Sequence, residues 1–406
     1  MEENFLFPGV AVVIDDEIDK EANIKDIVSQ ITGKDMPYLA YKEVPDDAVV
    51  KHWRGISFLL LDWRLLAEDV SDQVTAGVTT PAVLSAESIK ENVDFLKKFG
   101  EQCFAPVFIF TNEDIQNVIT VLKENGLYQE GKANYIFVKN KQDLVGNKLF
   151  DEVNSWIKTT PTVYVLKEWD RNYEKAKNRL FHDFYGLSPD WPRILWATFK
   201  EDGADMAEEM VNVINMNVQT RMVPFPFDES CLNGALGVGD TAEVSRVLEG
   251  ERFIKHAQLN QDNISTGDFF KVECQEGGVT KTQYFLNIRP QCDLMRGADL
   301  DKVDLYCLKC RIVDVSKING EGGVCLQQGQ FIEKINHALI PFIDDGKVIE
   351  VLFKDLKIKP WRELKDKRLG RILPPYIMRI QQRYALYLHR HGLPRIPDGV
   401  IGTRKV

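Results

Sequence analysis

Four short apolar runs, each followed by a polar residue, place the strongest constraint on the fold of this 406-residue chain. Each run is β-rich and short enough to be a buried parallel strand. The runs cover Val10–Ile14, Ile56–Leu61, Val107–Phe110 and Tyr135–Val138. Polar side chains at the carboxyl ends of parallel strands converge in one crevice, the usual ligand site of an open α/β sheet. The pattern therefore predicts a doubly wound parallel sheet with a polar site at one edge.

The residues that follow these runs are Asp15 with Asp16, then Asp62, Thr111 and Lys139. Taken singly, the aspartates would be helix caps or loop residues, and the lysine would be a solvated surface residue. Together they supply three carboxylates, a hydroxyl and an ammonium group. Clustered carboxylates repel one another, and a hard divalent cation relieves that repulsion while it neutralises phosphoryl oxygens. The set is typical of acyl-phosphate chemistry on Mg²⁺.

These motifs resemble the receiver domain of two-component response regulators, a flavodoxin-like five-stranded fold, and the resemblance covers residues 1–158. It implies that Asp62 is the phosphoacceptor, which attacks the phosphohistidine of a partner histidine kinase and becomes an aspartyl phosphate. It further implies a Mg²⁺ ion bound directly by Asp16, Asp62 and the backbone carbonyl of Arg64, with Asp15 acting through water. Such proteins signal from the cytoplasm.

The resemblance also gives two residues a role in reading the phosphoryl group. Lys139 would pair with one phosphoryl oxygen, and Thr111 would hydrogen-bond another, so that the new charge moves the Thr111 loop. The chain departs from the family at the position of the usual switch aromatic, which is Ile136 here. Arg64 and Glu113 flank the pocket, and we expect them to pair across its mouth.

Strand and helix patterns divide the chain into three predicted regions. Residues 1–158 form the receiver-like domain, residues 159–222 a helical region, and residues 223–406 a β-rich barrel or sandwich with a basic terminal helix. Helices are predicted for 18–31, 114–125, 141–157, 164–185, 203–222 and 376–391, and a further helix is predicted to begin at 88. The predicted strands outside the four apolar runs cover 38–44, 269–274, 283–288, 305–315 and 347–353.

Charge is distributed unevenly. Residues 354–406 carry 14 Lys/Arg against 4 Asp/Glu, a balance of +10, which leaves −20 on the rest of a chain whose net charge is −10. The basic region would suit nucleic acid by charge alone. However, no helix-turn-helix pattern is present, and Tyr376, Tyr384 and Tyr387 fall mostly on the apolar stripe of the predicted helix. We therefore favour a docking helix, within the chain or against another protein, over DNA binding.

The cysteines give a weaker signal. Seven cysteines are typical of a reduced cytoplasmic protein rather than a disulfide scaffold. Cys307 and Cys310 have zinc-knuckle spacing, and Cys292 with Cys325 would complete four ligands. However, residues three apart on a strand face opposite sides, which favours cysteines in the core.

The sequence thus favours a cytoplasmic receiver protein whose output is protein interaction, with Mg²⁺ as cofactor and no enzymatic activity beyond its own phosphotransfer. Candidate partners are the kinase, another response regulator or effector, and a second copy of the chain; the layout resembles, more weakly, receivers of phage-defence operons. No membrane span is predicted. The alternatives are a DNA-binding regulator that uses residues 354–395, and a receiver-gated enzyme with Asp268, Cys292, Asp293 or His256 in a pocket.

Overall fold

The computed structural model describes residues 9–53, 55–65, 82–203, 205–225, 227–233, 241–260, 263–295, 302–314, 332–333, 337–344 and 347–389. The chain divides into two compact units. The N-terminal unit comprises residues 1–189 with 214–235, and the C-terminal unit comprises 190–213 with 236–406. Helix α9 (Met206–Met222) contributes to both.

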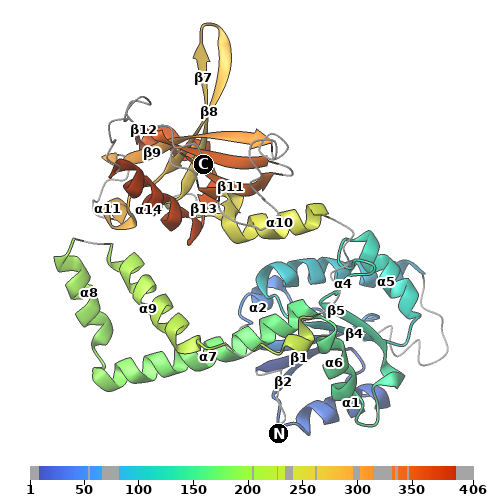
Figure 1. Cartoon of the computed structure of the whole chain (residues 1–406). Helices are drawn as coiled ribbons and strands as arrows, with labels where there is room; N and C mark the ends of the chain where they lie inside the picture. The colour runs from blue at the N-terminus through green and yellow to red at the C-terminus, as the bar shows by residue number, and fades with distance from the viewer. Residues whose placement is uncertain are drawn as a thin grey trace, which may run out of the picture. The chain divides into compact units, whose positions relative to one another are not determined.

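The N-terminal unit contains a five-stranded parallel sheet in the flavodoxin-like order β2-β1-β3-β4-β5, with helices on both faces (Figure 1). This confirms the predicted fold class. The strands are β1 (Val10–Ile14), β2 (Tyr38–Tyr41), β3 (Ile56–Asp62), β4 (Val107–Thr111) and β5 (Ile136–Asn140). The helices are α1 (Ala22–Thr32), α2 (Asp47–Val50), α4 (Ala82–Gln102), α5 (Ile115–Glu124), α6 (Leu149–Lys158) and α7 (Pro161–Leu187).

Strand β3 shows how the sheet is held between its helices, because all seven of its residues are buried. Successive side chains on a strand point to opposite faces. Phe58 and Leu60 pack in a core formed with α1, α6 and the start of α7, whereas Leu59 and Leu61 pack in a core formed with α2, α4 and α5. Both faces are therefore apolar, which explains why the strand is a continuous hydrophobic run.

Several helical segments differ from the sequence prediction. Helix α1 begins at Ala22 rather than residue 18, because turns occupy residues 16–20. The predicted helix at 141–157 is a 3₁₀ turn, η1 (Lys141–Asp143), followed by α6. The segment expected to separate two helices contains a third helix, α8 (Trp191–Glu201). Its Pro192 lies in the first turn, where proline disturbs no intrahelical hydrogen bond.

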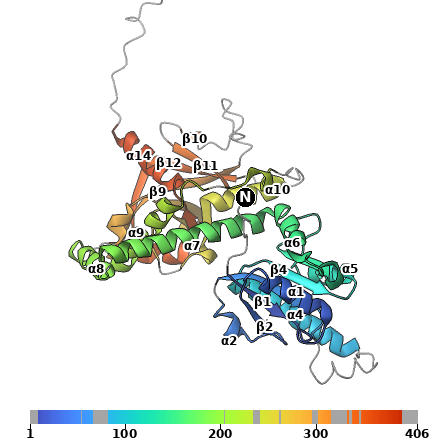
Figure 2. The same cartoon turned by 90° about the horizontal axis from the view of Figure 1, so that it is seen from below.

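Helix α7 is one uninterrupted 27-residue helix whose first turns belong to the core of the sheet domain (Figure 2). Val163 and Tyr164 are buried in the α1/α6 core. The buried Lys167 ammonium donates a hydrogen bond to the Ile56 carbonyl, 3.2 Å away, at the amino end of β3. Burial lowers the pKa of Lys167 to about 8. This contact fixes α7 to the end of the sheet opposite the polar residues.

The C-terminal unit is a curled antiparallel sheet, half of a barrel, followed by the helix α14 (Tyr376–Leu388). Its strand order is β10-β11-β12-β9-β8-β7-β13-β6. The strands are β6 (Phe253–Lys255), β7 (Asp268–Glu276), β8 (Val279–Asn287), β9 (Asp304–Asp314), β10 (Ile332–Glu333), β11 (His337–Asp344), β12 (Lys347–Pro360) and β13 (Arg368–Ile372). Helices α10 (Thr241–Arg252), α11 (Gln291–Met295) and α13 (Trp361–Leu364) connect them. Four of these strands match predicted ones.

A buried ion network joins β7 to β13. The Asp268 carboxylate accepts from Arg371 Nε at 2.7 Å and from Arg368 Nη1 at 3.3 Å. The Asp268 and Arg368 side chains are both fully buried, and Arg368 Nε also donates to His256 Nδ1 at 3.2 Å. Charged groups are tolerated at such depth only when they are paired and hydrogen-bonded. The network therefore fixes the register of the two strands.

Close packing at β13 predicts a large effect of adding one methyl group. A Cβ at Gly370 would meet the Ile254 carbonyl oxygen and the Phe253 ring. We expect Gly370→Ala to lower the free energy of unfolding of the C-terminal unit by about 1–3 kcal/mol, the usual cost of overpacking. The matched control is Gly250→Ala in α10, where the new methyl would meet nothing and Ala is the better helix former. Urea titrations that showed equal stability for both variants would contradict this packing.

Candidate functional site

Three aspartates meet at the carboxyl edge of the parallel sheet. Asp15 and Asp16 directly follow β1, Asp62 ends β3, and the two strands are paired neighbours. Oxygen atoms of the three carboxylates all lie within 4.8 Å of one another, and all three residues are buried. The structure thus brings together the three carboxylates that the sequence pattern predicts.

A lysine that the sequence analysis missed lies inside this cluster. Lys141 Nζ is 2.8 Å from Asp15 Oδ2, 2.8 Å from Asp62 Oδ2 and 2.7 Å from Glu21 Oε2. The ammonium group thereby directs all three of its N–H donors at carboxylates. The Lys141 side chain is only 1% exposed. Lys141 is the first residue of η1, immediately after β5.

The prediction that Lys139 is the pocket cation is wrong. Lys139 Nζ instead forms an ion pair with Glu152 of α6, at 2.9 Å, and both side chains are partly exposed. Strand β5 extends through Asn140, beyond the apolar run that the sequence shows. Side chains alternate along a strand, so Lys139 shares the α6 face with Phe137. The turn after Asn140 then directs Lys141 to the carboxylates.

Two hydrogen bonds to α4 fix the backbone after Asp62. The Trp63 carbonyl accepts from Asn92 Nδ2 at 2.8 Å, and the Leu65 carbonyl accepts from Ser88 Oγ at 2.7 Å. Between them, the Arg64 N–H donates to Asp62 Oδ1 at 3.3 Å. These contacts place Arg64 beside the cluster. That the carbonyl oxygen of Arg64 binds a metal ion stays a prediction.

The remaining predicted residue, Thr111, is buried at the end of β4, between β3 and β5. Its Oγ1 accepts a hydrogen bond from the Glu113 N–H at 3.0 Å. Glu113 also lies 3.9 Å from Arg64 Nη1, so the expected pair across the pocket is present, at long range. Asn112 lies between Thr111 and Glu113 in sequence, and its Nδ2 donates to Glu21 Oε1 at 3.2 Å. The loop after β4 is thus linked to the segment after β3 through Arg64 and to the segment after β1 through Glu21.

The cluster has an excess of negative charge. The carboxylates of Asp15, Glu21 and Asp62 surround the one ammonium group of Lys141, so these four groups carry a formal charge of −2 when all are ionised. Burial raises the pKa of Asp62 to about 7; the charge of Asp15 adds to this effect, and Lys141 opposes it. Burial likewise raises the pKa of Asp15. Burial alone would lower the pKa of Lys141, but the charges of Asp62 and Asp15 outweigh it and raise that pKa.

The donor set fits a hard divalent cation. Carboxylate oxygens are the ligands that Mg²⁺, Ca²⁺ and Mn²⁺ prefer. A divalent ion among Asp15, Asp16 and Asp62 would offset most of the excess charge. The residues do not by themselves distinguish Mg²⁺ from the other hard cations.

The other candidates from the sequence do not form a comparable site. Cys307 packs in one core of the C-terminal sheet and Cys310 in the other, on opposite faces, and burial raises the pKa of both thiols. Cys325 lies outside the described residues. Asp268 and His256 both contact Arg368 in the structural network. Cys292 is exposed on α11, with Sγ 3.7 Å from Asp293 Oδ1.

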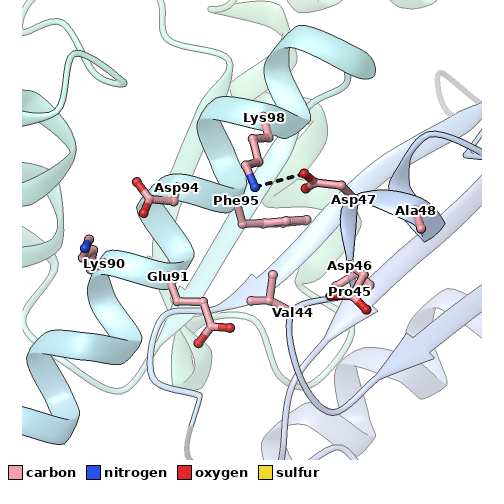
Figure 3. A pocket seen from close by; sticks show the side chains of 10 residues that line it. All are labelled: Val44, Pro45, Asp46, Asp47, Ala48, Lys90, Glu91, Asp94, Phe95 and Lys98. Atoms are coloured by element: carbon pink, nitrogen blue, oxygen red, sulfur yellow. Dashed lines mark hydrogen bonds and ion pairs between the residues drawn. The ribbon is translucent and has the colours of Figure 1, made fainter.

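A separate groove of about 670 Å³ lies between α2 and α4 (Figure 3). Phe95 and Val44 form part of its lining, and an ion pair between Lys98 Nζ and Asp47 Oδ2, 3.0 Å long, joins the two helices beside it. Its other lining residues are Pro45, Asp46, Ala48, Lys90, Glu91 and Asp94. None of the cluster residues lines this groove.

Comparison with known proteins identifies no relative: no family model and no curated protein matches the sequence. Among the described helices, none is long and apolar enough to cross a membrane.

The raised pKa of Asp62 predicts a pH-dependent stability. A carboxyl group whose pKa rises from the ordinary 3.8 to about 7 on folding stabilises the folded state below pH 4, and this contribution is lost between pH 4 and 7. Asp62→Asn removes the group that is costly to ionise. We expect the variant to match wild type near pH 3.5 and to exceed it at pH 8, by at most about 4 kcal/mol. Urea titrations with a metal chelator test this; an unchanged difference between the two pH values would contradict it.

The two lysines give a matched test of the corrected assignment. Lys141→Met leaves the buried carboxylates of Asp15 and Asp62, and the partly exposed one of Glu21, without their cation. We therefore expect a loss of about 3–5 kcal/mol in the free energy of unfolding. Lys139→Met removes a partly exposed pair and should cost less than about 1 kcal/mol. Both changes remove one charge and keep a similar length. Equal losses in chelator-treated protein at pH 7 would refute the assignment of Lys141 to the cluster.

Proposed function

We propose that this chain is a response-regulator-type receiver protein that accepts a phosphoryl group on Asp62. The observation that supports this proposal most strongly is the buried contact of Lys141 with both Asp15 and Asp62, at 2.8 Å each. One edge of the sheet then holds the carboxylate of Asp62 as nucleophile, the ammonium of Lys141 to pair with the transferred group, and the carboxylates of Asp15 and Asp16 for a metal ion. An arrangement that only stabilised the fold would not need three carboxylates around one ammonium group.

The chemistry is a displacement at phosphorus. An oxygen of the ionised Asp62 carboxylate attacks the phosphoryl group of a phosphohistidine, the P–N bond breaks, and its electron pair stays on the imidazole, which takes up a proton. Bound among the aspartates, Mg²⁺ would supply charge neutralisation to the phosphoryl oxygens and keep Asp62 ionised. Lys141 is positioned to pair with a phosphoryl oxygen, since its ammonium already contacts Asp62 Oδ2. Thr111, at the end of β4, would hydrogen-bond another.

The proposed output is protein interaction from the cytoplasm, without further enzymatic activity. Tyr384 and Tyr387 of α14 pack on the core of the C-terminal sheet, so these tyrosines serve packing rather than base stacking. Asp268 and His256 contact Arg368 in the network between β7 and β13, whereas Cys292 and Asp293 lie on α11. Its partners would be a histidine kinase and an effector, or a second response regulator.

Intact-mass spectrometry tests the proposal directly. After incubation with acetyl phosphate and Mg²⁺, wild type should gain the mass of one phosphoryl group, and hydroxylamine should remove it, as expected of an acyl phosphate. Asp62→Asn should gain nothing, because the nucleophile is gone. Asp47→Asn, which removes an exposed carboxylate of the α2/α4 groove, should behave as wild type. A correctly folded wild type that stays unmodified, or a modified Asp62→Asn, would contradict the function.

A further inference from the structure

Glu21 stands out in the cluster because it belongs neither to the predicted metal-binding aspartates nor to the strand ends. It lies at the residue before α1, and its side chain makes no capping hydrogen bond to that helix. Oε1 accepts a 3.4 Å hydrogen bond from Asn23 Nδ2 of α1, and two further contacts of the carboxylate reach other segments. Oε2 is 2.7 Å from Lys141 Nζ, and Oε1 accepts from Asn112 Nδ2 at 3.2 Å. The side chain is only 16% exposed.

These two contacts connect three loops of the same sheet edge. Glu21 follows β1, Asn112 follows β4, and Lys141 follows β5. A single carboxylate therefore links the segment that leads into α1 with the loop next to Thr111 and with the pocket cation. Helix capping does not require the Glu21 side chain, so its position is explained by these contacts together with the longer hydrogen bond from Asn23.

We propose that Glu21 is a positioning residue that competes with the phosphoryl group for Lys141; this inference rests on the function proposed above. Before transfer, Glu21 holds one of the three donors of Lys141 and adds a negative charge that repels an anionic phosphodonor. After transfer, a phosphoryl dianion next to Lys141 repels the Glu21 carboxylate. Release of Glu21 then also frees Asn112 and the segment before α1.

The proposal offers an output route that does not need an aromatic switch on β5. Ile136 is buried in the core that the sheet forms with α2, α4 and α5. Val138, three residues before Lys141, is also aliphatic, so neither position carries an aromatic side chain. The movement would instead reach the β1–α1 segment. Residues Ile18, Asp19, Lys25, Val28, Tyr38, Ala40 and Lys42 of this region line a cavity of about 420 Å³. A change at Glu21 would therefore alter a surface that a partner protein can read.

The decisive variant is Glu21→Gln, which keeps the shape and removes the charge. At saturating Mg²⁺, we expect acetyl phosphate to phosphorylate it about tenfold faster than wild type, as the loss of one nearby like charge predicts. Damage to the fold would slow the reaction, so an acceleration cannot come from a merely structural role. The control is Asp19→Asn, the same change two residues earlier on an exposed carboxylate that pairs with Lys42. This control should leave the rate unchanged.

A second measurement needs neither metal nor phosphate. Amide hydrogen exchange of the chelator-treated protein should be faster in Glu21→Ala than in wild type at residues 111–116, more than 90 positions away in sequence. Asp19→Ala should leave those amides unchanged. Unaltered exchange at 111–116 would show that Glu21 does not hold the β4–α5 loop, and would overturn the proposal.

The outcomes separate this proposal from the function on which it rests. Phosphorylation of wild type and Glu21→Gln at equal rates would leave Asp62 as the acceptor and refute the competition by Glu21. Phosphorylation of both proteins, with Glu21→Gln about tenfold faster than wild type, would support both. Failure of both to react would refute the function and with it the competition, whatever the exchange data show about the loop.

Discussion

One buried ammonium group organises the polar edge of the N-terminal unit. Lys141 lies among carboxylates from two segments and is almost fully excluded from water. In such surroundings a charge is tolerated only with close partners, and carboxylates at this depth are tolerated only with a cation. The lysine and the aspartates therefore depend on one another. The remaining negative charge makes the cluster a site where binding a cation is favourable.

The sequence predicted the sheet and the aspartates well because both depend on local pattern. An apolar run followed by Asp62 must end at the edge of a buried parallel strand, wherever its helices pack. Which lysine enters the cluster depends on where β5 ends and on how the chain turns after Asn140. Two candidate lysines lie two residues apart, and periodicity alone assigns both to the same face of a strand. Only the 3₁₀ turn at Lys141 separates them, and a short turn leaves little trace in sequence.

The same reasoning explains the outcome for the C-terminal unit. Strands β7, β8, β9 and β12 have long β-rich patterns and were predicted close to their positions. Strand β13 contains Arg368, Gly370 and Arg371, which read as a loop. Its place in the sheet is fixed by the buried Asp268 network, whose partner lies 100 residues earlier in sequence. An ion pair over that separation cannot be recognised from a single chain.

The hairpin of β7 and β8 extends past the sheet that carries it. β13 pairs with β7 only as far as Phe270, and β9 pairs with β8 only from Tyr284 onward. Beyond these points, the outer edges of the hairpin have no neighbour among the described strands, and such edges tend to recruit strands of other molecules. Lys271 and Glu273, paired at 2.9 Å, place charges along one edge. Charges at such an edge oppose edge-to-edge aggregation, since a second strand would have to bury them.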